Sequence, residues 1–206
     1  MRIKVCGLTR QEDVKACRDL GADWVGFIFH PDSPRSINPE RAAALDTKDL
    51  LRVGVFVRQN PEEALRIMRD CRLDLAQLHG DQTPDFCRRL GPERVIRTFW
   101  PKRYEGGQDL QLELDRFASC CSWFLLDAGR SGGGHGIRID ASLLECGLRL
   151  ERPWILAGGL GPGNIRESLA LAPDGVDLNS GVESAPGLKD RQAMRATIKA
   201  IQGERG

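Results

Sequence analysis

Short apolar runs alternate with longer segments of helical periodicity along almost the whole chain. Eight runs read as strands: residues 3–5, 24–29, 51–57, 73–78, 94–100, 123–127, 154–158 and 175–180. Several are apolar almost throughout, without the polar alternation of a sheet that has one face in water. This pattern predicts parallel strands that are covered by helices.

Helical segments lie between these runs, and several carry clear start and stop signals. Asn60 and Thr83 are N-cap residues that are each followed by proline, and Gly21 and Gly91 stand where helices end. The predicted helices are 10–21, 38–46, 60–71, 83–91, 107–118, 161–172 and 189–201. Strands that alternate with helices in this way indicate repeated βα units.

Eight βα units in 206 residues predict a compact (β/α)8 barrel that forms a single domain over residues 1–206. A doubly wound open sheet is the alternative, but it usually has one dominant glycine-rich loop after its first strand. Here glycines follow several strand ends, at Gly7, Gly80, Gly129, Gly158, Gly159 and Gly181. This distribution favours a barrel, whose catalytic face is built from all the βα loops.

Composition and charge narrow the possible functions. The formal net charge is +1, so no excess field attracts nucleic acid or an anionic membrane surface. No apolar run reaches the roughly 18 residues of a membrane span, and the N-terminus is too polar for a secretory signal. We therefore expect a cytoplasmic protein that binds neither nucleic acid nor membrane.

The cysteine pattern argues against disulfides and structural zinc. Seven cysteines occur without a CxxC pair, and no two histidines have metal-ligand spacing, so we expect no metal site. Cys6 differs from the others because it ends the first strand, on the predicted catalytic face. A thiol there can serve as a base or nucleophile, or it can be a packing residue. The other six are expected to be packing residues.

The last two strand ends carry the strongest signal for a ligand. Gly158 and Gly159 follow the seventh strand, and Ser180 and Gly181 follow the eighth. Glycines at such positions let backbone N–H groups face an anion, and barrels often bind phosphate after these two strands. One such loop alone would be read as a tight turn. Two in succession predict a phosphate site.

Four further side chains are candidates at strand ends. Asp127 follows four bulky residues, so we expect it at the barrel mouth as a general acid, with a helix cap or a partner of Arg130 as the alternative. Arg35, in a segment stiffened by Pro31 and Pro34, suits carboxylate binding, although a solvated loop arginine would look the same. Gln77 and His79 point the same way from the fourth strand. We favour His79 as a hydrogen-bonded strut over an acid or base.

These segments together resemble the phosphoribosylanthranilate isomerases of tryptophan biosynthesis. The resemblance rests on residues 4–9 (KVCGLT), 21–29, 33–37, 52–57, 75–82, 125–136, 156–165 and 175–190, in this order. It implies an Amadori rearrangement of N-(5-phosphoribosyl)anthranilate to 1-(o-carboxyphenylamino)-1-deoxyribulose 5-phosphate, without metal or organic cofactor. It also implies a small phosphorylated substrate as the partner, and a monomer or a homodimer is compatible with the sequence.

The resemblance implies roles for individual residues. Cys6 corresponds to the general base and Asp127 to the general acid, and we expect a lowered thiol pKa beside a raised carboxyl pKa. Arg35 is implied to hold the anthranilate carboxylate, and the loops at Gly158-Gly159 and Ser180-Gly181 the phosphate. We assign Asp177 to the sugar hydroxyls or to orienting the acid.

Three departures from the family pattern and three alternative functions accompany this interpretation. His135 replaces a small hydroxyl residue in a loop expected to be mobile, Phe and Trp are missing around Asp140, and Asn179 replaces a serine. An indoleglycerol-phosphate synthase would need lysines at strand ends, and a ribulose-phosphate epimerase would need metal-binding residues there. A non-catalytic phosphate-sensing barrel would not need the intact pair of Cys6 and Asp127.

Overall fold

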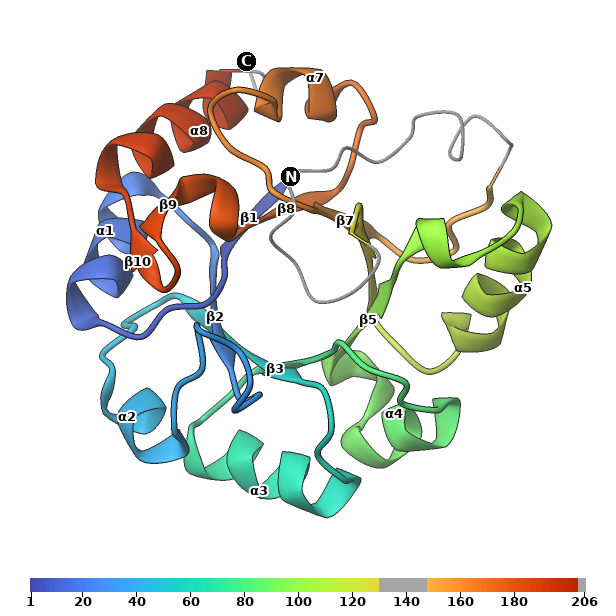
Figure 1. The fold of residues 1–206 in the computed structure, drawn as a ribbon. Helices are drawn as coiled ribbons and strands as arrows, with labels where there is room; N and C mark the ends of the chain where they lie inside the picture. Colours follow the sequence, from blue (N-terminus) through green and yellow to red (C-terminus); the bar gives the residue numbers. More distant parts are fainter. Residues whose placement is uncertain (130–147, 204–206) are drawn as a thin grey trace.

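The computed structural model describes residues 1–129 and 148–203, and within them eight parallel strands close into a barrel in chain order (Figure 1). The strands are β1 (Arg2–Val5), β2 (Trp24–Ile28), β3 (Leu51–Phe56), β4 (Leu75–Leu78), β5 (Val95–Phe99), β6 (Trp123–Asp127), β7 (Trp154–Ala157) and β8 (Gly175–Leu178). The prediction of a (β/α)8 barrel is confirmed, and the open sheet is excluded because β1 pairs with β8.

Helices surround the barrel on its outside (Figure 1). They are α1 (Gln11–Leu20), α2 (Pro39–Ala44), α3 (Pro61–Asp70), α4 (Pro84–Leu90), α5 (Gly107–Ala118), α7 (Ile165–Leu169) and α8 (Arg191–Gly203), with short 3-10 turns η1 (Pro92–Arg94), η2 (Pro101–Arg103) and η3 (Ser180–Val182). None of the described helices is long and apolar enough to cross a membrane. The loop that the sequence predicted to be mobile, with His135 and Asp140, lies outside the described residues apart from Gly129.

The predicted capping signals act as expected. The side chain of Asn60 accepts a hydrogen bond from the backbone N–H of Glu63 at 2.8 Å, and Thr83 accepts one from Phe86. Gly21 ends α1 with a φ of 83°, a left-handed conformation that glycine adopts without strain. These local interactions fix where α1, α3 and α4 begin or end.

A small hairpin was not predicted from the sequence. Residues after η3 form a small antiparallel hairpin of β9 (Glu183–Ala185) and β10 (Leu188–Lys189) before α8 begins. Its strands have three and two residues, too short for a periodic signal. The hairpin lies beside the barrel between β8 and α8 (Figure 1).

The barrel interior changes character along its axis because alternate residues of each strand face inward. Near the amino ends of the strands the interior is apolar and is filled by Trp24, Val53, Ile96, Leu125 and Ile155. Toward the carboxyl ends the interior also holds buried polar or charged residues: Lys4, Gln77, Thr98, Asp127 and Asp177. Strand ends that carry buried polar groups are where a barrel places its active site.

Candidate active site

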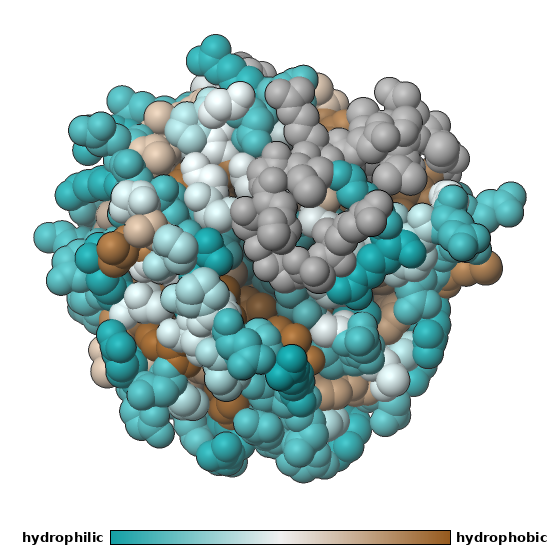
Figure 2. Space-filling model, in the orientation of Figure 1, coloured by the Kyte–Doolittle hydropathy of each residue, from teal (hydrophilic) through white to brown (hydrophobic). Residues whose placement is uncertain are grey.

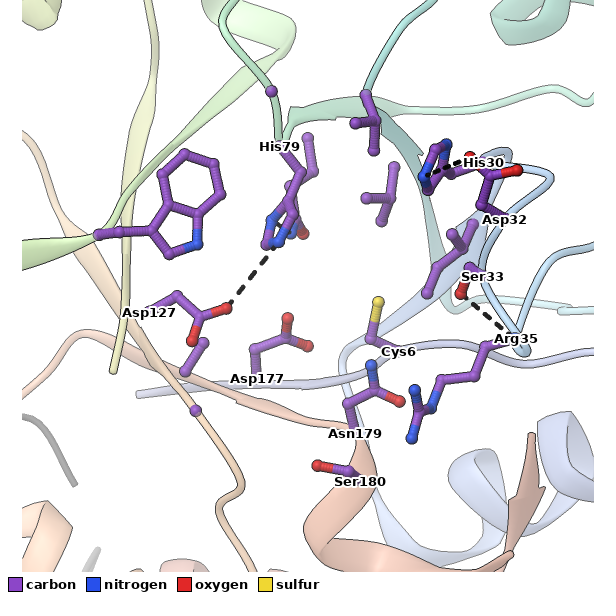
Figure 3. Close-up of a pocket in the computed structure, with 18 of the residues that line it drawn as sticks. Cys6, His30, Asp32, Ser33, Arg35, His79, Asp127, Asp177, Asn179 and Ser180 are labelled. Atoms are coloured by element: carbon purple, nitrogen blue, oxygen red, sulfur yellow. Dashed lines mark hydrogen bonds and ion pairs between the residues drawn. The ribbon is translucent and has the colours of Figure 1, made fainter. Parts of the chain in front are cut away.

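A cavity of about 420 Å³ opens at the carboxyl ends of the strands. In the view down the barrel, hydrophilic residues cover most of the outer rim and more hydrophobic ones appear toward the centre (Figure 2). The cavity lining includes nine of the ten predicted site residues: Cys6, Arg35, Gln77, His79, Asp127, Gly158, Gly159, Asp177 and Ser180. Gly181 is the exception. The structure thus brings together residues from six different strands or the loops that follow them (Figure 3).

Cys6 directly follows β1 and points into this cavity (Figure 3). It is only 3% exposed. The six cysteines of the described range are all buried and none of them forms a disulfide there. Of these six, only Cys6 lines the cavity. Its position at a strand end, predicted from the sequence, therefore separates it from the packing cysteines.

The expectation of a lowered thiol pKa for Cys6 was wrong for the ligand-free site. Burial raises the pKa of Cys6, because it penalises the thiolate more than nearby charges favour it. The charge of Lys4 is the main opposing effect, whereas the charge of Asp177 raises the pKa further. Sequence reasoning placed Cys6 correctly but did not include the desolvation that a closed barrel imposes.

Asp127, the last residue of β6, is 4% exposed. Its Oδ1 accepts a hydrogen bond from the backbone N–H of Gly129 at 2.9 Å, and its Oδ2 lies 3.9 Å from Nε2 of His79. The carboxyl group faces the cavity opposite Cys6 and beside Asp177 (Figure 3). This placement suits a group that delivers a proton to a bound molecule.

His79 is a neutral imidazole in this site. Burial, followed by the positive charges of Lys4 and Arg97, lowers its pKa to about 3. Its Nδ1 lies 3.3 Å from Nε2 of Gln77 and 3.2 Å from Oγ1 of Thr98. With the Gln77 amide as donor, Nδ1 accepts, so that the ring proton is on Nε2 and faces Asp127. These contacts support the strut that the sequence favoured over an acid or base.

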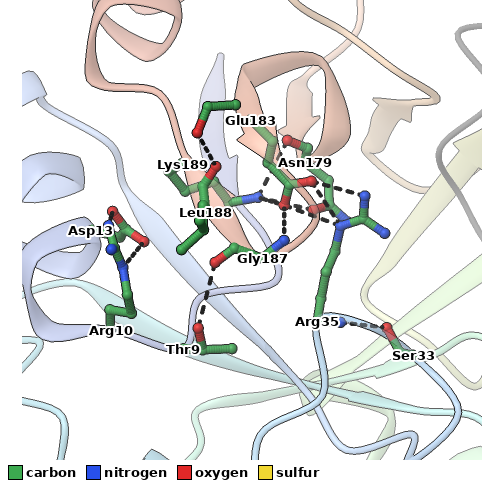
Figure 4. Close-up of polar contacts among 11 residues, drawn as sticks. Thr9, Arg10, Asp13, Ser33, Arg35, Asn179, Glu183, Gly187, Leu188 and Lys189 are labelled. Atoms are coloured by element: carbon green, nitrogen blue, oxygen red, sulfur yellow. Dashed lines mark hydrogen bonds and ion pairs between the residues drawn. The ribbon is translucent and has the colours of Figure 1, made fainter.

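Arg35 is held rigidly by a carboxylate that the sequence analysis did not identify. Its Nε and Nη2 donate to Glu183 of β9 at 2.8 to 3.0 Å (Figure 4). Glu183 also accepts from Lys189 of β10 at 2.7 Å, and together these two cations hold its pKa below its ordinary value despite burial. Within the described residues, Nη1 of Arg35 donates to no protein acceptor. The guanidinium therefore retains donor capacity for a ligand.

Asn179, one of the departures from the family pattern, lines the same side of the cavity. Its Oδ1 accepts from Nζ of Lys189 at 2.9 Å. An ammonium group has only donors, so the amide oxygen must face Lys189 and the amide nitrogen is directed away from it. Figure 3 shows that nitrogen on the side of Cys6. The amide nitrogen of Asn179 thus offers hydrogen-bond donors to this side of the cavity.

The two glycine loops pack tightly against each other. A Cβ at Gly161 would lie 2.2 Å from the carbonyl oxygen of Gly181, and a Cβ at Gly181 would lie 2.2 Å from that of Leu160. Gly181 thus permits close approach of the loops, although it does not line the cavity. Gly158 and Gly159 have φ values of 116° and 68°, as a turn that favours glycine requires.

The backbone of these loops offers free donors. Among the described residues, the N–H groups of Gly159, Ser180 and Gly181 donate to no protein acceptor. Asn164 holds the first loop, since it donates to the carbonyl of Gly159 and accepts from the N–H of Gly161. Unpaired backbone donors in two adjoining loops are suited to an oxyanion.

Sequence reasoning missed three charged residues that shape the site: Lys4, Glu183 and Lys189. Lys4 lies inside β1 and not at a strand end, yet its ammonium reaches the polar interior. A lysine within an apolar strand is a signal in itself, since lysine is rarely buried without a partner. Glu183 and Lys189 gave no such signal, because their pairing depends on a hairpin too short to be predicted.

The fold and the cavity define a class of protein. A closed (β/α)8 barrel carries, at the carboxyl ends of its strands, a buried thiol, a buried carboxyl group and two glycine loops with free N–H donors. Among the described residues, no group of three His, Cys, Asp or Glu side chains could hold a metal ion. These features are those of a barrel enzyme for a small anionic substrate.

Comparison with known proteins identifies the family. The family model described as N-(5'-phosphoribosyl)anthranilate (PRA) isomerase matches residues 3–200. The N-(5'-phosphoribosyl)anthranilate isomerase of Desulfovibrio desulfuricans is 50% identical over 207 residues, which cover 100% of this chain and 98% of that protein. The chain belongs to the phosphoribosylanthranilate isomerase family, and it is an isomerase of tryptophan biosynthesis.

Solved structures agree with this assignment. The phosphoribosyl anthranilate isomerase of Thermus thermophilus has a TM-score of 0.85 and 39% identity, with 100% of both chains covered. A further phosphoribosyl anthranilate isomerase, in complex with reduced 1-(o-carboxyphenylamino)-1-deoxyribulose 5-phosphate, has a TM-score of 0.83 and 33% identity. That comparison covers 98% of this chain and 99% of the other.

Proposed function

We propose that this protein converts N-(5-phosphoribosyl)anthranilate to 1-(o-carboxyphenylamino)-1-deoxyribulose 5-phosphate, with Cys6 as general base and Asp127 as general acid. The observation that carries the proposal is the convergence of these two buried groups on one cavity from β1 and β6. Membership of the family and a relative bound to a reduced form of the product support the choice of substrate. The chain acts as one barrel domain, as a monomer or a homodimer.

The reaction is an internal redox change, in which C1 of the sugar is reduced and C2 is oxidised. Asp127 donates a proton to the ring oxygen as the C1–O bond breaks, and the anilino nitrogen supplies the electron pair that forms an iminium cation. Cys6, as thiolate, then removes the C2 proton. The resulting enolamine tautomerises to the ketone. Each step needs only proton transfer at a positioned side chain.

The remaining polar groups bind the two anionic ends of the substrate. The free N–H groups of Gly159, Ser180 and Gly181 are proposed to bind the phosphate. Arg35, which Glu183 holds in place, is proposed to bind the anthranilate carboxylate through its remaining donors. Gln77, His79 and Asp177 then lie beside the sugar, where the neutral His79 contributes polarity without charge. Gly158 contributes to the proposed phosphate site through the turn that its positive φ allows.

The proposed activity is tested by the fluorescence of freshly prepared phosphoribosylanthranilate. We expect the purified protein to remove this fluorescence far faster than the spontaneous decay of the substrate. A rate equal to spontaneous decay would reject the proposed reaction. The rate measured with a Cys6→Ala protein, purified in the same way, is the baseline that reports any contaminating isomerase.

The assignment of Arg35 predicts a binding defect. In Arg35→Lys the charge next to Glu183 remains, but the planar group that can donate to a carboxylate from two nitrogens is lost. A charge-assisted hydrogen bond contributes about 1.5–3 kcal/mol, so we expect KM to rise by about 10- to 100-fold. The change in kcat should be much smaller, because Arg35 touches no reacting atom in the proposal. Steady-state kinetics measure both.

A matched control for this variant is Arg69→Lys. Arg69 pairs with Asp70 at the surface of α3, and its side chain is 75% exposed. Both kinetic constants should stay at their wild-type values in this control. If Arg35→Lys instead lowered kcat at unchanged KM, Arg35 would act in the chemical step and the carboxylate would bind elsewhere.

A further inference from the structure

Lys4 is a buried cation that the mechanism above does not use. It is 1% exposed, in the middle of β1, and its ammonium reaches the polar part of the barrel interior. Nζ donates to both carboxylate oxygens of Asp177 at 2.9 Å. Lys4 and Asp177 are also register partners of the adjacent strands β1 and β8. The position of the ammonium is therefore set both by the pairing of β1 with β8 and by the carboxylate of Asp177.

Cys6 stands two residues after Lys4, so the two side chains enter the interior from the same face of β1. Gly26 of β2 makes room for both. A Cβ at Gly26 would lie 2.7 Å from Sγ of Cys6 and 3.1 Å from Nζ of Lys4. Glycine inside a strand often marks such a close approach. The thiol and the ammonium thus share a space that only a glycine neighbour leaves open.

We propose that Lys4 is a positioning residue for the base: its ammonium, anchored by Asp177, is the counter-charge of the Cys6 thiolate. This inference rests on the proposed role of Cys6 in catalysis. One ammonium lies between two acids, the carboxylate of Asp177 and the thiol of Cys6. When Cys6 takes the C2 proton of the substrate, Lys4 keeps its own proton and its pair with Asp177, so its charge does not change during the step.

The electrostatics agree with this arrangement. Burial favours the neutral amine, but the charges of Asp177 and Cys6 outweigh it and raise the pKa of Lys4, which keeps the ammonium charged. The charged groups that act on Cys6 are Lys4 of its own strand, Asp177 of β8 and Lys189 of β10. Lys189 is already engaged by Glu183 and by Asn179. Of the two cations, Lys4 has the larger effect on the pKa of the thiol.

The test measures the reactivity of the thiol without turnover. Iodoacetamide reacts with thiolates, so the rate of Cys6 alkylation as a function of pH follows its ionisation. The full chain is used without substrate, and mass spectrometry quantifies the peptide that contains Cys6. Alkylation of Cys87, buried in α4, is read in the same digest and reports any opening of the fold.

Two substitutions are expected to act in opposite directions. Lys4→Met removes the counter-charge, so the pH midpoint rises and the Cys6 rate near pH 8 falls by at least about tenfold, which corresponds to one pKa unit. Asp177→Asn removes the competing anion, so the midpoint falls and the rate near neutral pH increases. A purely structural role would raise the rates of Cys6 and Cys87 together in both variants.

A double variant covers the case in which a single one does not fold. Breaking a buried ion pair is costly because it leaves one charge unpaired in the interior. Lys4→Met combined with Asp177→Asn removes both charges and avoids this cost. It should still alkylate more slowly than the wild type, because Lys4 acts on the thiol more strongly than Asp177 does. An unchanged or faster Cys6 rate in every variant that lacks Lys4 would overturn the proposal. Normal turnover of Cys6→Ala would reject Cys6 as base but leave this readout intact.

Discussion

Replacement of Cys6 by alanine is expected to lower kcat by about 10³-fold or more. In the proposed mechanism Cys6 removes the C2 proton, and a positioned base contributes roughly 10²- to 10⁴-fold. The water that could enter the enlarged cavity is a far weaker base than a thiolate. KM should change little, because the thiol makes no contact with the phosphate or the carboxylate of the substrate. The measurement is the steady-state loss of substrate fluorescence.

The matched control for this variant is Cys87→Ala. Cys87 is fully buried in α4, and burial raises the pKa of its thiol to about 12, so it remains a neutral packing group. Each substitution removes one buried sulfur atom, and we expect each to lower the free energy of unfolding by about 1 kcal/mol. Only Cys6→Ala should lose activity. Loss of activity in both, or in neither, would remove Cys6 from its role.

Replacement of Asp127 by asparagine is also expected to lower kcat strongly. The amide is close in shape to the carboxyl group and can still accept from the N–H of Gly129. It has no acidic proton to give to the ring oxygen, so C1–O cleavage loses its general acid. We expect kcat to fall by about 10²- to 10⁴-fold with an almost unchanged thermal midpoint. Wild-type turnover of Asp127→Asn would remove Asp127 from the mechanism.

The pH profile of Asp127→Asn gives a sharper test than its rate. In the wild type the profile combines two proposed proton-transfer groups, so it does not isolate the contribution of the Cys6 thiol.

Of the proposed acid–base pair, only the thiol remains in Asp127→Asn, and burial raises its pKa above the ordinary value. The residual kcat/KM should therefore rise by about tenfold per pH unit between pH 6 and pH 8. A flat profile for this variant would show that a group other than Cys6 is the base.

Much of the fold was predictable because its determinants are local. The eight apolar runs and the caps at Asn60 and Thr83 each act within a few residues, and all eight strands were placed within two residues of their ends. The period of two also showed that Gln77 and His79 share a face. The hairpin of β9 and β10 was missed, since its strands are too short for a periodic signal.

The sequence predicted which residues lie in the candidate site, but not how burial and neighbouring charges shift their pKa values. Cys6, Asp127 and the glycines follow strand ends, and the carboxyl ends of parallel strands meet at one face of a barrel. The roles proposed for Cys6 and Asp127 came from family resemblance and stay predictions. What the sequence could not show is the cost of burial, which reversed the expected direction of the Cys6 pKa shift.

By itself, the sequence determined that this chain forms a (β/α)8 barrel and that Cys6 and Asp127 stand at strand ends on one face of it. Both follow from periodicity and strand ends, which are short-range properties of the chain. Only the tertiary structure decided the partners of those side chains. Lys4 and Asp177 are 173 positions apart, and Arg35 and Glu183 are 148 apart. Closure of the barrel between β1 and β8 brings the first pair together, and it also removes the water that would otherwise screen their charges.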